Sequence, residues 1–399
     1  MAKSIDQFQR DFDRYIETTR TTWDVPGIAV AVVKDGRTVF IKGYGVRDLA
    51  TGKKVDSHTV FQLASLSKTF ASTLAGVLSD RGRLKWDAPV NRYLPQLLIG
   101  SEEQTKQITL RHILSHTTGF PAHAGDPRIE GAEGFDAIIK SFEKLKILYP
   151  PGKVFDYQNV IYSLSGSVIE KVLGMSYSEA VQSYLFWPLN MNDASLGFDS
   201  LIQTNNRAVP YRYVNGGHVA VAYSKNYYTV LPAAGVNASI ADMAEWIKLH
   251  TGSTKPTWDM TGAIIGSATL SMIHKPFVSS PAETHRMRRY TGRVDKTYYG
   301  LGWRIYHYGG HNVICHAGML NGFKSLLSFS PETHTGIVLL SNSTSPVLGI
   351  IRSYFFDQLF DLSFVDWNKD FKDSEIKAKA KKASRKAHGK KKKRKAKRR

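Results

Sequence analysis

The chain has 399 residues, 42% hydrophobic and 22% charged, which is the composition of a globular protein long enough to bury a large core. Its longest apolar runs, such as residues 27–33, are far too short to cross a bilayer, so we expect no transmembrane segment. The net charge is +20, but residues 376–399 hold 15 Lys and Arg and no acid, which leaves 39 basic and 34 acidic residues (+5) elsewhere.

The first 20 residues mix charged and isolated apolar side chains. A secretory signal needs an apolar core of ~7–15 residues, and none is present. If the chain as written is complete, this pattern predicts a cytoplasmic protein. The single cysteine, Cys315, excludes an intramolecular disulfide and a thiolate metal cluster. The 13 histidines contain no His-Glu-x-x-His pattern, and we expect neither a metal nor a cofactor.

The N-terminal part of the chain predicts one helix followed by a β-hairpin. Apolar residues recur at helical spacing between Ile5 and Ile16. Residues 27–33 and 38–44 are rich in β-forming side chains and flank the turn sequence Lys34-Asp35-Gly36.

The middle of the chain predicts mostly helices and loops. Each expected helix is an apolar-periodic segment followed by a glycine or by turn residues, and the last is preceded by Ser239 as an N-cap. These helices cover residues 66–80, 110–115, 161–173 and 239–250.

Strand character returns late, followed by a closing helix over about residues 352–362. The expected strands cover residues 302–308, 312–316, 323–330 and 336–341. Strands at both ends of the sequence predict an α/β (α+β) fold. In it, helices flank an antiparallel sheet built from about residues 25–50 and 297–365, and about residues 60–290 form a mostly helical insertion. We expect one domain over residues 1–368 and a basic, disordered tail over residues 369–399.

Ser65-Leu66-Ser67-Lys68 begins the first apolar helix of the middle region. Residues three apart share a helix face, so the Lys68 amine can lie beside the Ser65 hydroxyl. A serine hydroxyl needs a neighbouring base to become a nucleophile, and a buried lysine can be that base in its neutral form. The start of a helix also offers free N–H groups to an oxyanion.

The Ser-x-x-Lys pattern alone is weak, because Ser141 and Ser374 also begin one. Both of these lie in polar segments, where a lysine would stay protonated. Only Ser65 precedes a helix apolar enough to be buried. On this motif alone, Ser65 is better explained as an ordinary N-cap.

Two further motifs, by their order along the chain and the elements they adjoin, favour a catalytic role for Ser65 over an N-cap. Tyr157-Gln158-Asn159 precedes a helix of the middle region, and His316-Ala317-Gly318 ends a late strand. Each triplet is common by itself: Tyr213-x-Asn215 fits the first pattern, and three other histidines begin His-x-Gly.

In these three motifs the sequence resembles the penicillin-recognising serine hydrolases, in the group of class C β-lactamases, D-Ala-D-Ala carboxypeptidases and esterases. The resemblance runs from about residue 5 to residue 365 and implies a β-lactamase/transpeptidase-like fold. Supporting phrases are Leu114-Ser-His-Thr-Thr-Gly119, Pro150-Pro-Gly152 and Ala233-Ala-Gly-Val-Asn-Ala-Ser239.

The resemblance implies a role for each motif residue. Ser65 would attack a carbonyl, while Lys68 and Tyr157 would share general-base and general-acid duty. Asn159 would orient Lys68 and a substrate amide. The resemblance also implies that His316 and Gly318 border the substrate, that the backbone N–H groups of Ser65 and Met319 form the oxyanion hole, and that the protein resides in the periplasm or cell envelope.

The third motif departs from the Lys-Thr-Gly of class C β-lactamases. His316 offers a positive charge only when protonated, and Ala317 lacks a hydroxyl. Peptidase, amidase or esterase activity therefore fits at least as well as β-lactam hydrolysis. Cys315 adjoins His316 and suggests a cysteine nucleophile, but neighbours on a strand point to opposite faces, so a buried structural cysteine is the better interpretation.

Two functional hypotheses follow. In the first, the chain is a serine hydrolase that forms an acyl-enzyme at Ser65 with a small amide or ester, such as a peptidoglycan stem peptide, a β-lactam or a carboxylic ester. In the second, it is a catalytically weak scaffold or binding protein. In either, the basic residues 376–399 are expected to attract polyanions or an anionic membrane.

Overall fold

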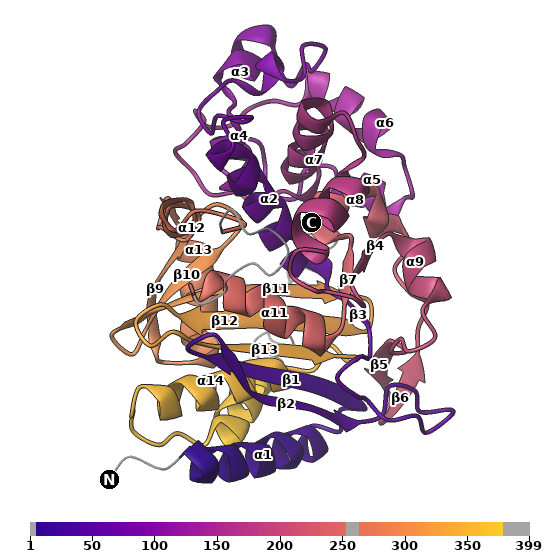
Figure 1. Cartoon of the computed structure of the whole chain (residues 1–399), viewed down its shortest axis with the longest axis vertical. Coiled ribbons are helices and arrows are strands. Elements are labelled where there is room, and N and C mark those ends of the chain that lie inside the picture. The colour runs from indigo at the N-terminus through magenta and orange to yellow at the C-terminus, as the bar shows by residue number, and fades with distance from the viewer. Residues whose placement is uncertain (1–4, 253–262, 378–399) are drawn as a thin grey trace, which may run out of the picture.

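The computed structural model describes residues 5–252 and 263–377 of the chain. Its centre is an antiparallel sheet of eight strands in the order β2-β1-β13-β12-β11-β10-β9-β8. Helices cover both faces of this sheet, and a mostly helical region extends from one side of it (Figure 1). The strands are β1 Gly27–Lys34, β2 Arg37–Gly45, β8 Val278–Ser279, β9 Val294–Tyr299, β10 Arg304–Tyr308, β11 His311–Leu320, β12 Phe323–Ser330 and β13 Thr335–Ser341.

The helices carry the chain between the two groups of strands and close the fold. They are α1 Ile5–Thr22, α2 Lys68–Asp80, α3 Glu102–Gln107, α4 Leu110–Leu114, α5 Asp126–Glu130, α6 Phe135–Lys140, α7 Asn159–Leu173, α8 Tyr177–Val181, α9 Phe198–Gln203, α10 Leu231–Ala234, α11 Ile240–His250, α12 Ser267–Ile273, α13 Pro281–Tyr290 and α14 Val347–Leu359. Short strands form two small sheets, one of β3 Phe61–Gln62, β7 Val236–Ala238 and β4 Ser195–Leu196, the other of β5 Tyr211–Val214 and β6 Gly217–Ala220.

Strand β1 shows why the sheet is covered on both faces. Its side chains alternate between two hydrophobic cores, because successive residues of a strand point to opposite sides. Ala29, Ala31 and Val33 belong to the core that contains α2 and α11. Ile28, Val30 and Val32 belong to the core formed with α1 and α14. A strand buried on both faces reads as a continuous apolar run, as residues 27–33 do.

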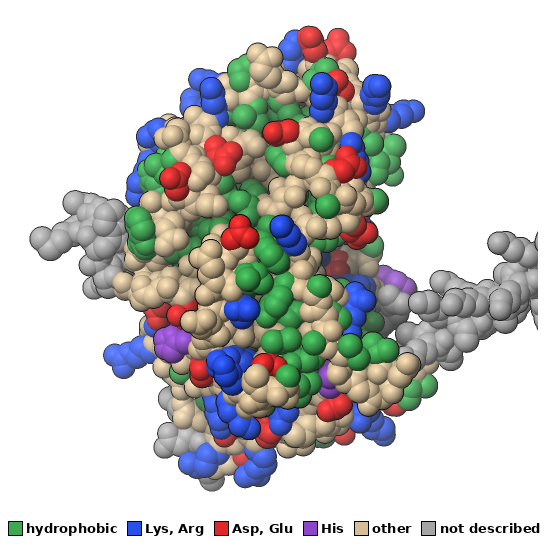
Figure 2. Space-filling view, turned by 90° about the vertical axis from the view of Figure 1, so that its right-hand side faces the viewer, with side chains coloured by type: hydrophobic (Ala, Val, Ile, Leu, Met, Phe, Trp, Pro, Cys, Tyr) green, Lys and Arg blue, Asp and Glu red, His purple; other side chains and the backbone are tan. Residues whose placement is uncertain are grey.

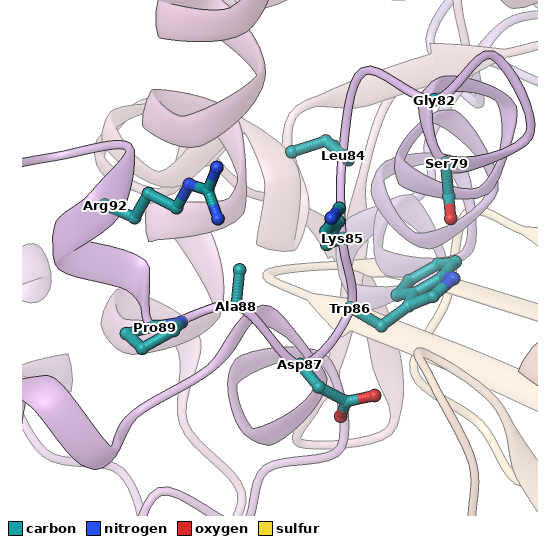
Figure 3. A pocket seen from close by; sticks show the side chains of 9 residues that line it. All are labelled: Ser79, Gly82, Leu84, Lys85, Trp86, Asp87, Ala88, Pro89 and Arg92. Atoms are coloured by element: carbon teal, nitrogen blue, oxygen red, sulfur yellow. The ribbon is translucent and has the colours of Figure 1, made fainter.

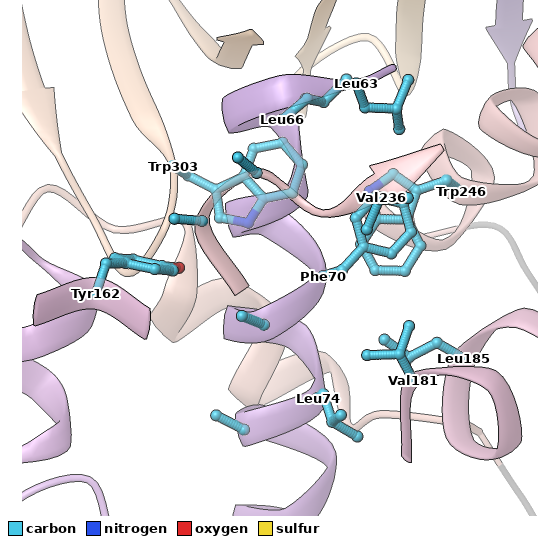
Figure 4. Packing of buried hydrophobic residues seen from close by; sticks show 14 of the residues in the cluster. Leu63, Leu66, Phe70, Leu74, Tyr162, Val181, Leu185, Val236, Trp246 and Trp303 are labelled. Carbon is cyan, nitrogen blue, oxygen red and sulfur yellow. The ribbon is translucent and has the colours of Figure 1, made fainter. Parts of the chain in front are cut away.

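Helix α2 is fixed in the larger core by aromatic packing (Figure 4). The Phe70 ring stacks on Trp246 of α11, with 3.9 Å between the ring centroids. The Trp246 indole N–H donates to the Thr69 hydroxyl at 3.2 Å. Burying one such aromatic side chain stabilises the fold by about 2–3 kcal/mol. This packing holds α2 in place, and with it the turn that precedes the helix.

The sequence-based fold class is confirmed. Strand β1 pairs with β13 over seven residues, from Ile28↔Ser341 to Lys34↔Thr335, so the sheet is assembled from both ends of the chain. The expected strand over residues 312–316 is longer than predicted and continues to Leu320.

The boundary expected between residues 368 and 369 differs from the structure. Residues 367–377 are helical. Trp367 and Phe371 are buried against Ile350, and the Trp367 indole donates to Asp357 at 3.0 Å. Two buried aromatic side chains keep this segment on the folded body despite its charged composition. The rest of the expected tail, residues 378–399, lies outside the described residues.

The surface of the body carries charges of both signs, scattered above and below a band of hydrophobic side chains (Figure 2). Within residues 5–252 and 263–377, no helix has the length and hydropathy that crossing a membrane requires.

Candidate active site

The turn that carries Ser65 is held by two neighbouring elements. Residues Ala64–Ser67 form a 3₁₀ turn that leads directly into α2. Ala64, just before Ser65, has a positive φ of 51°, a conformation that non-glycine residues adopt only when their surroundings impose it. The Ser67 hydroxyl accepts from the Val236 amide of β7 at 2.9 Å, and the Ser325 hydroxyl of β12 donates to the Leu63 carbonyl at 2.6 Å.

Gly318 allows strand β11 to approach this turn. A Cβ atom at residue 318 would lie 2.0 Å from the Leu63 carbonyl oxygen, 2.6 Å from the Ser325 hydroxyl and 2.9 Å from the Ser65 backbone nitrogen. The glycine thus leaves the space through which Ser325 reaches Leu63, and it brings β11 backbone beside the amide of Ser65. Met319 follows on the same strand, with a side chain that is 64% exposed.

Lys68 is fully buried at the start of α2. Its amine donates to the Asn159 side-chain oxygen at 2.7 Å and to the Ala233 carbonyl at 3.1 Å. Burial lowers the pKa of this amine well below its ordinary value; the Asp126 charge opposes the shift and the Arg304 charge adds to it. A neutral amine has two N–H groups, which these two acceptors use, and its lone pair remains available to take a proton.

The Asn159 amide is oriented by a carboxylate behind it. Its nitrogen donates to Asp126 at 2.9 Å, which turns its oxygen toward Lys68. The same Asp126 oxygen lies 2.8 Å from Nδ1 of His123. A hydrogen-bonded chain therefore runs from Lys68 through Asn159 and Asp126 to a histidine at the surface.

Tyr157 lies between the serine and the lysine. The Lys68 nitrogen is 4.6 Å from the centroid of its ring, and its phenol is within hydrogen-bonding reach of the Ser65 hydroxyl. Burial raises the pKa of Tyr157 to about 12, against the opposing effects of the Arg304 charge and of the Ser65 contact. The phenol is therefore neutral near pH 7.

The third motif is placed differently from the expectation for its histidine. His316 points to the face of the sheet that carries Ser65, but it is only 1% exposed. Its Nδ1 faces the Ala317 carbonyl at 3.0 Å and must donate, and its Nε2 lies 3.0 Å from the Tyr299 hydroxyl. Burial lowers the pKa of His316 well below its usual value, so the ring is neutral. The prediction that this side chain lines the substrate site does not fit its burial.

Strand β11 has a free edge beside the serine. Its pairing with β10 stops at Arg304↔Cys315, whereas its pairing with β12 continues to Leu320. Residues 316–320 therefore pair on one side only in the sheet, and an extended substrate backbone can hydrogen-bond to the other side.

Three residues of this site carry no signal in the sequence. Asp126, Tyr299 and Arg304 reach it through the fold: Asp126 lies 33 residues before Asn159, and Tyr299 lies 17 residues before His316. Tyr299 contacts His316 through its hydroxyl.

Cys315 is separated from the site by the strand itself. It is buried in the core on the opposite face from His316, and burial raises the pKa of its thiol to about 11. The interpretation of Cys315 as a buried structural residue fits this placement.

The cavity shown in Figure 3 lies away from these residues. It has a volume of about 620 Å³ and is lined by Ser79, Gly82, Leu84, Lys85, Trp86, Asp87, Ala88, Pro89 and Arg92. Ser79 is near the far end of α2, roughly 16 Å along the helix from its first residue. Across the described ranges, no three His, Cys, Asp or Glu side chains are grouped to hold a metal ion.

Comparison with known proteins places the chain in a family. The family model described as Beta-lactamase matches residues 12–354. The chain belongs to the beta-lactamase family. This confirms the resemblance stated from the three motifs, and membership implies the acyl-enzyme chemistry of serine hydrolases.

Individual relatives are distant. The chain is 27% identical to the Unguisins hydrolase of Aspergillus campestris (strain IBT 28561), over 93% of this chain and 69% of that protein. It is 25% identical to Protein flp of Staphylococcus aureus (strain N315), over 84% of this chain and 64% of that protein. The chain thus spans about two thirds of the length of these relatives.

Two solved structures share the fold. One is the octameric penicillin-binding protein homologue from Pyrococcus abyssi, with a TM-score of 0.76 and 23% identity over 89% of this chain and 78% of that one. The other is the class C beta-lactamase from Rhodobacter sphaeroides, with a TM-score of 0.68 and 21% identity over 88% of this chain and 98% of that one.

Proposed function

We propose that this chain hydrolyses a small amide or ester through an acyl-enzyme on Ser65. The observation that carries the proposal is the state of Lys68. The Lys68 amine is fully buried, donates to the Asn159 and Ala233 oxygens and lies 4.6 Å from the centroid of the Tyr157 ring. Burial lowers its pKa, which favours the neutral amine, whose lone pair can take a proton. A buried base next to a serine on a rigid turn is the arrangement that nucleophilic catalysis requires.

In the proposed reaction the Ser65 oxygen attacks the carbonyl carbon, and its proton passes to Lys68 by way of Tyr157. The neutral Tyr157 then delivers a proton to the leaving group, because a phenol with a pKa of about 12 remains a donor at neutral pH. The backbone N–H groups of Ser65 and Met319 would stabilise the oxyanion. A water molecule would release the acyl group by the same proton path in reverse.

The substrate classes that fit are D-Ala-D-Ala peptides of the peptidoglycan stem type, β-lactams and carboxylic esters. The free edge of β11 suits a substrate with an extended peptide-like backbone. The second candidate function, a catalytically weak scaffold, is disfavoured by the same site, since a scaffold has no use for a buried lysine whose pKa is lowered by burial.

A fluorophosphonate probe tests the proposal. We expect intact-mass analysis to find one adduct on the full-length protein and to locate it on Ser65. Ser65→Ala should abolish the adduct, whereas Ser141→Ala, which alters another Ser-x-x-Lys sequence, should keep it. An adduct on any other residue, or none on a folded protein, would reject the acyl-enzyme. A screen of p-nitrophenyl esters, nitrocefin and D-Ala-D-Ala peptides then ranks the substrate classes.

We also propose that the basic end of the chain binds polyanions, such as nucleic acid, an anionic lipid surface or an acidic envelope polymer. The proposal depends on charge alone: residues 376–399 contain 15 Lys and Arg and no acid. Counterion release favours binding of such a segment to any dense array of negative charge.

A further inference from the structure

His123 lies beside Tyr157 in a backbone conformation that non-glycine residues seldom adopt. Its φ is 59°, in the left-handed region. Two backbone hydrogen bonds hold it there: the His123 amide donates to the Tyr157 carbonyl at 2.7 Å, and the Asp126 amide donates to the His123 carbonyl at 3.1 Å. Backbone strain of this kind is concentrated at functional sites, where the surrounding structure imposes it. The conformation of His123 therefore directs attention to its side chain.

Asp126 orients the imidazole ring of His123. Nδ1 of the ring lies 2.8 Å from an Asp126 carboxylate oxygen, and the same oxygen accepts from the Asn159 amide at 2.9 Å. A carboxylate offers only acceptors, so Nδ1 carries the proton and Nε2 of the neutral ring keeps a lone pair. A histidine whose Nδ1 is held by a buried carboxylate is the general base of the serine hydrolases that use a Ser-His-Asp triad.

The lone pair of His123 is open to solvent next to the candidate nucleophile. The side chain is 61% exposed, and no protein group in the described ranges binds its Nε2. The centroid of the ring is 5.7 Å from that of Tyr157, whose phenol is within hydrogen-bonding reach of Ser65. A water molecule that enters the site beside Tyr157 can therefore meet an imidazole nitrogen that is free to accept its proton.

Lys68 is less well placed to take a proton from an incoming water molecule. It is fully buried, and its amine donates to Asn159 and Ala233. Its nitrogen lies 4.6 Å from the centroid of the Tyr157 ring, a position that suits proton exchange with Ser65 through the phenol. Tyr157 thus adjoins two nitrogen bases, one buried and one exposed to solvent.

Two other histidines near Tyr157 are buried and offer no lone pair to solvent. His116 accepts from the Gln158 amide through Nδ1 at 3.1 Å, so its Nε2 carries the proton. His316 donates through Nδ1 to the Ala317 carbonyl, and its Nε2 faces the Tyr299 hydroxyl. His123 is therefore the histidine of this group that can act on water.

We propose that His123 is the general base of deacylation, with Asp126 as the carboxylate that orients it. The water oxygen bonds to the carbonyl carbon of the acyl-enzyme, and the water proton passes to Nε2 of His123. The bond between this carbon and the Ser65 oxygen then breaks, and Tyr157 donates its proton to that oxygen. The His123 imidazolium returns a proton to the Tyr157 oxygen through solvent, so the protons balance. This inference rests on the proposed acyl-enzyme function of Ser65.

The test measures acylation and deacylation separately on the full-length protein with 4-nitrophenyl hexanoate. Rapid mixing gives acylation from the release of nitrophenol, and intact-mass spectra of quenched samples follow the hexanoyl adduct. His123→Asn removes the base, but asparagine tolerates a positive φ and can still donate to Asp126. We expect deacylation to slow by about a hundredfold, so that the adduct accumulates. Acylation and fluorophosphonate labelling of Ser65 should stay near the wild-type rate.

Two further variants identify the imidazole as the responsible group. His58→Asn is the matched control, because the His58 side chain is 65% exposed and its Nδ1 lies 2.8 Å from Asp193, in the segment before β3. It should leave both rates unchanged. His123→Gly removes the imidazole, and glycine adopts a positive φ without strain. Added imidazole should restore deacylation in His123→Gly and have no effect on His58→Asn.

Several results would overturn the proposal. These are unchanged deacylation in His123→Asn, equal losses in acylation and deacylation, or a comparable loss in His58→Asn. Equal losses would mean that His123 acts through Asp126 on the orientation of Asn159. If His123→Asn does not fold, failure of imidazole to restore deacylation in His123→Gly overturns it. Labelling of Ser65 with unchanged deacylation in the variants rejects His123 alone, whereas failure of the wild type to label rejects the acyl-enzyme itself.

Discussion

Lys68 and Tyr157 handle the same proton in the proposed reaction, and this predicts how their variants combine. We expect Lys68→Ala and Tyr157→Phe each to slow acylation of a neutral ester severely, and the double variant to be little worse than either. Residues that act as one unit give losses that do not add. Single-turnover acylation rates provide the measurement. A double variant whose loss in free energy equals the sum of the single losses would contradict a shared proton path.

The pH dependence of acylation follows from the direction in which burial shifts the pKa of Lys68. Only the neutral amine can accept a proton, so acylation should be present above the pKa of Lys68 in the folded protein and lost as the pH falls through it. Burial lowers that pKa from 10.5, so the loss should occur well below pH 10.5. A kcat/KM profile with its acidic limb near pH 10.5 would contradict a base whose pKa burial has lowered.

At the scale of residues, a site residue can be identified from the sequence when its partners in the site lie close to it along the chain. Ser65 and Lys68 are one helical turn apart, and Tyr157 and Asn159 are fixed by the start of α7. Asp126 and Arg304 could not be predicted in the same way. Each is an ordinary charged residue in its own segment, and only the tertiary fold brings it to Asn159 or to Tyr157.

At the scale of elements, the contact between β11 and the turn before α2 depends on Gly318. We expect Gly318→Ala to lower kcat/KM by about a hundredfold, since the added methyl group would push β11 away from Ser65, and shifts of about 1 Å are costly to catalysis. Gly134→Ala is the matched control. Its φ of −68° suits alanine, and a Cβ atom there would meet open space. Comparable activity of the two alanine variants would mean that the close approach of β11 is dispensable.

Long elements were predictable from the sequence and very short ones were not. Strands β1, β12 and β13 are long enough for their apolar pattern to be clear. Strands β3 and β4 have two residues each and β7 has three, so no periodicity can develop, yet the Val236 amide of β7 holds the turn of Ser65. The local geometry of the nucleophile therefore depends on elements too short to be recognised before the fold is known.

At the scale of the whole molecule, the division of charge predicts a separable function. The basic excess lies after residue 375 of the sequence, but composition alone missed the buried aromatic residues that keep the helix of residues 367–377 on the body. The experiment that separates catalysis from polyanion binding should therefore cut after Lys377, because an earlier cut would also remove folded structure.

We expect removal of residues 378–399 to leave hydrolysis of a neutral ester unchanged, because all the proposed catalytic residues lie at or before Met319. Binding to DNA and to anionic vesicles should be lost, since the removed segment has 14 Lys and Arg and no acid. In the full chain, this binding should weaken by at least about tenfold between about 50 and about 200 mM salt. It should show little sequence preference, as the segment has no aromatic side chain to stack on bases.

A full-length variant with Gln in place of these Lys and Arg residues is the matched control and should also fail to bind. If truncation instead impairs hydrolysis of the neutral ester while the Gln variant retains it, the segment acts on catalysis through something other than its charge, and the proposed division of the chain is wrong.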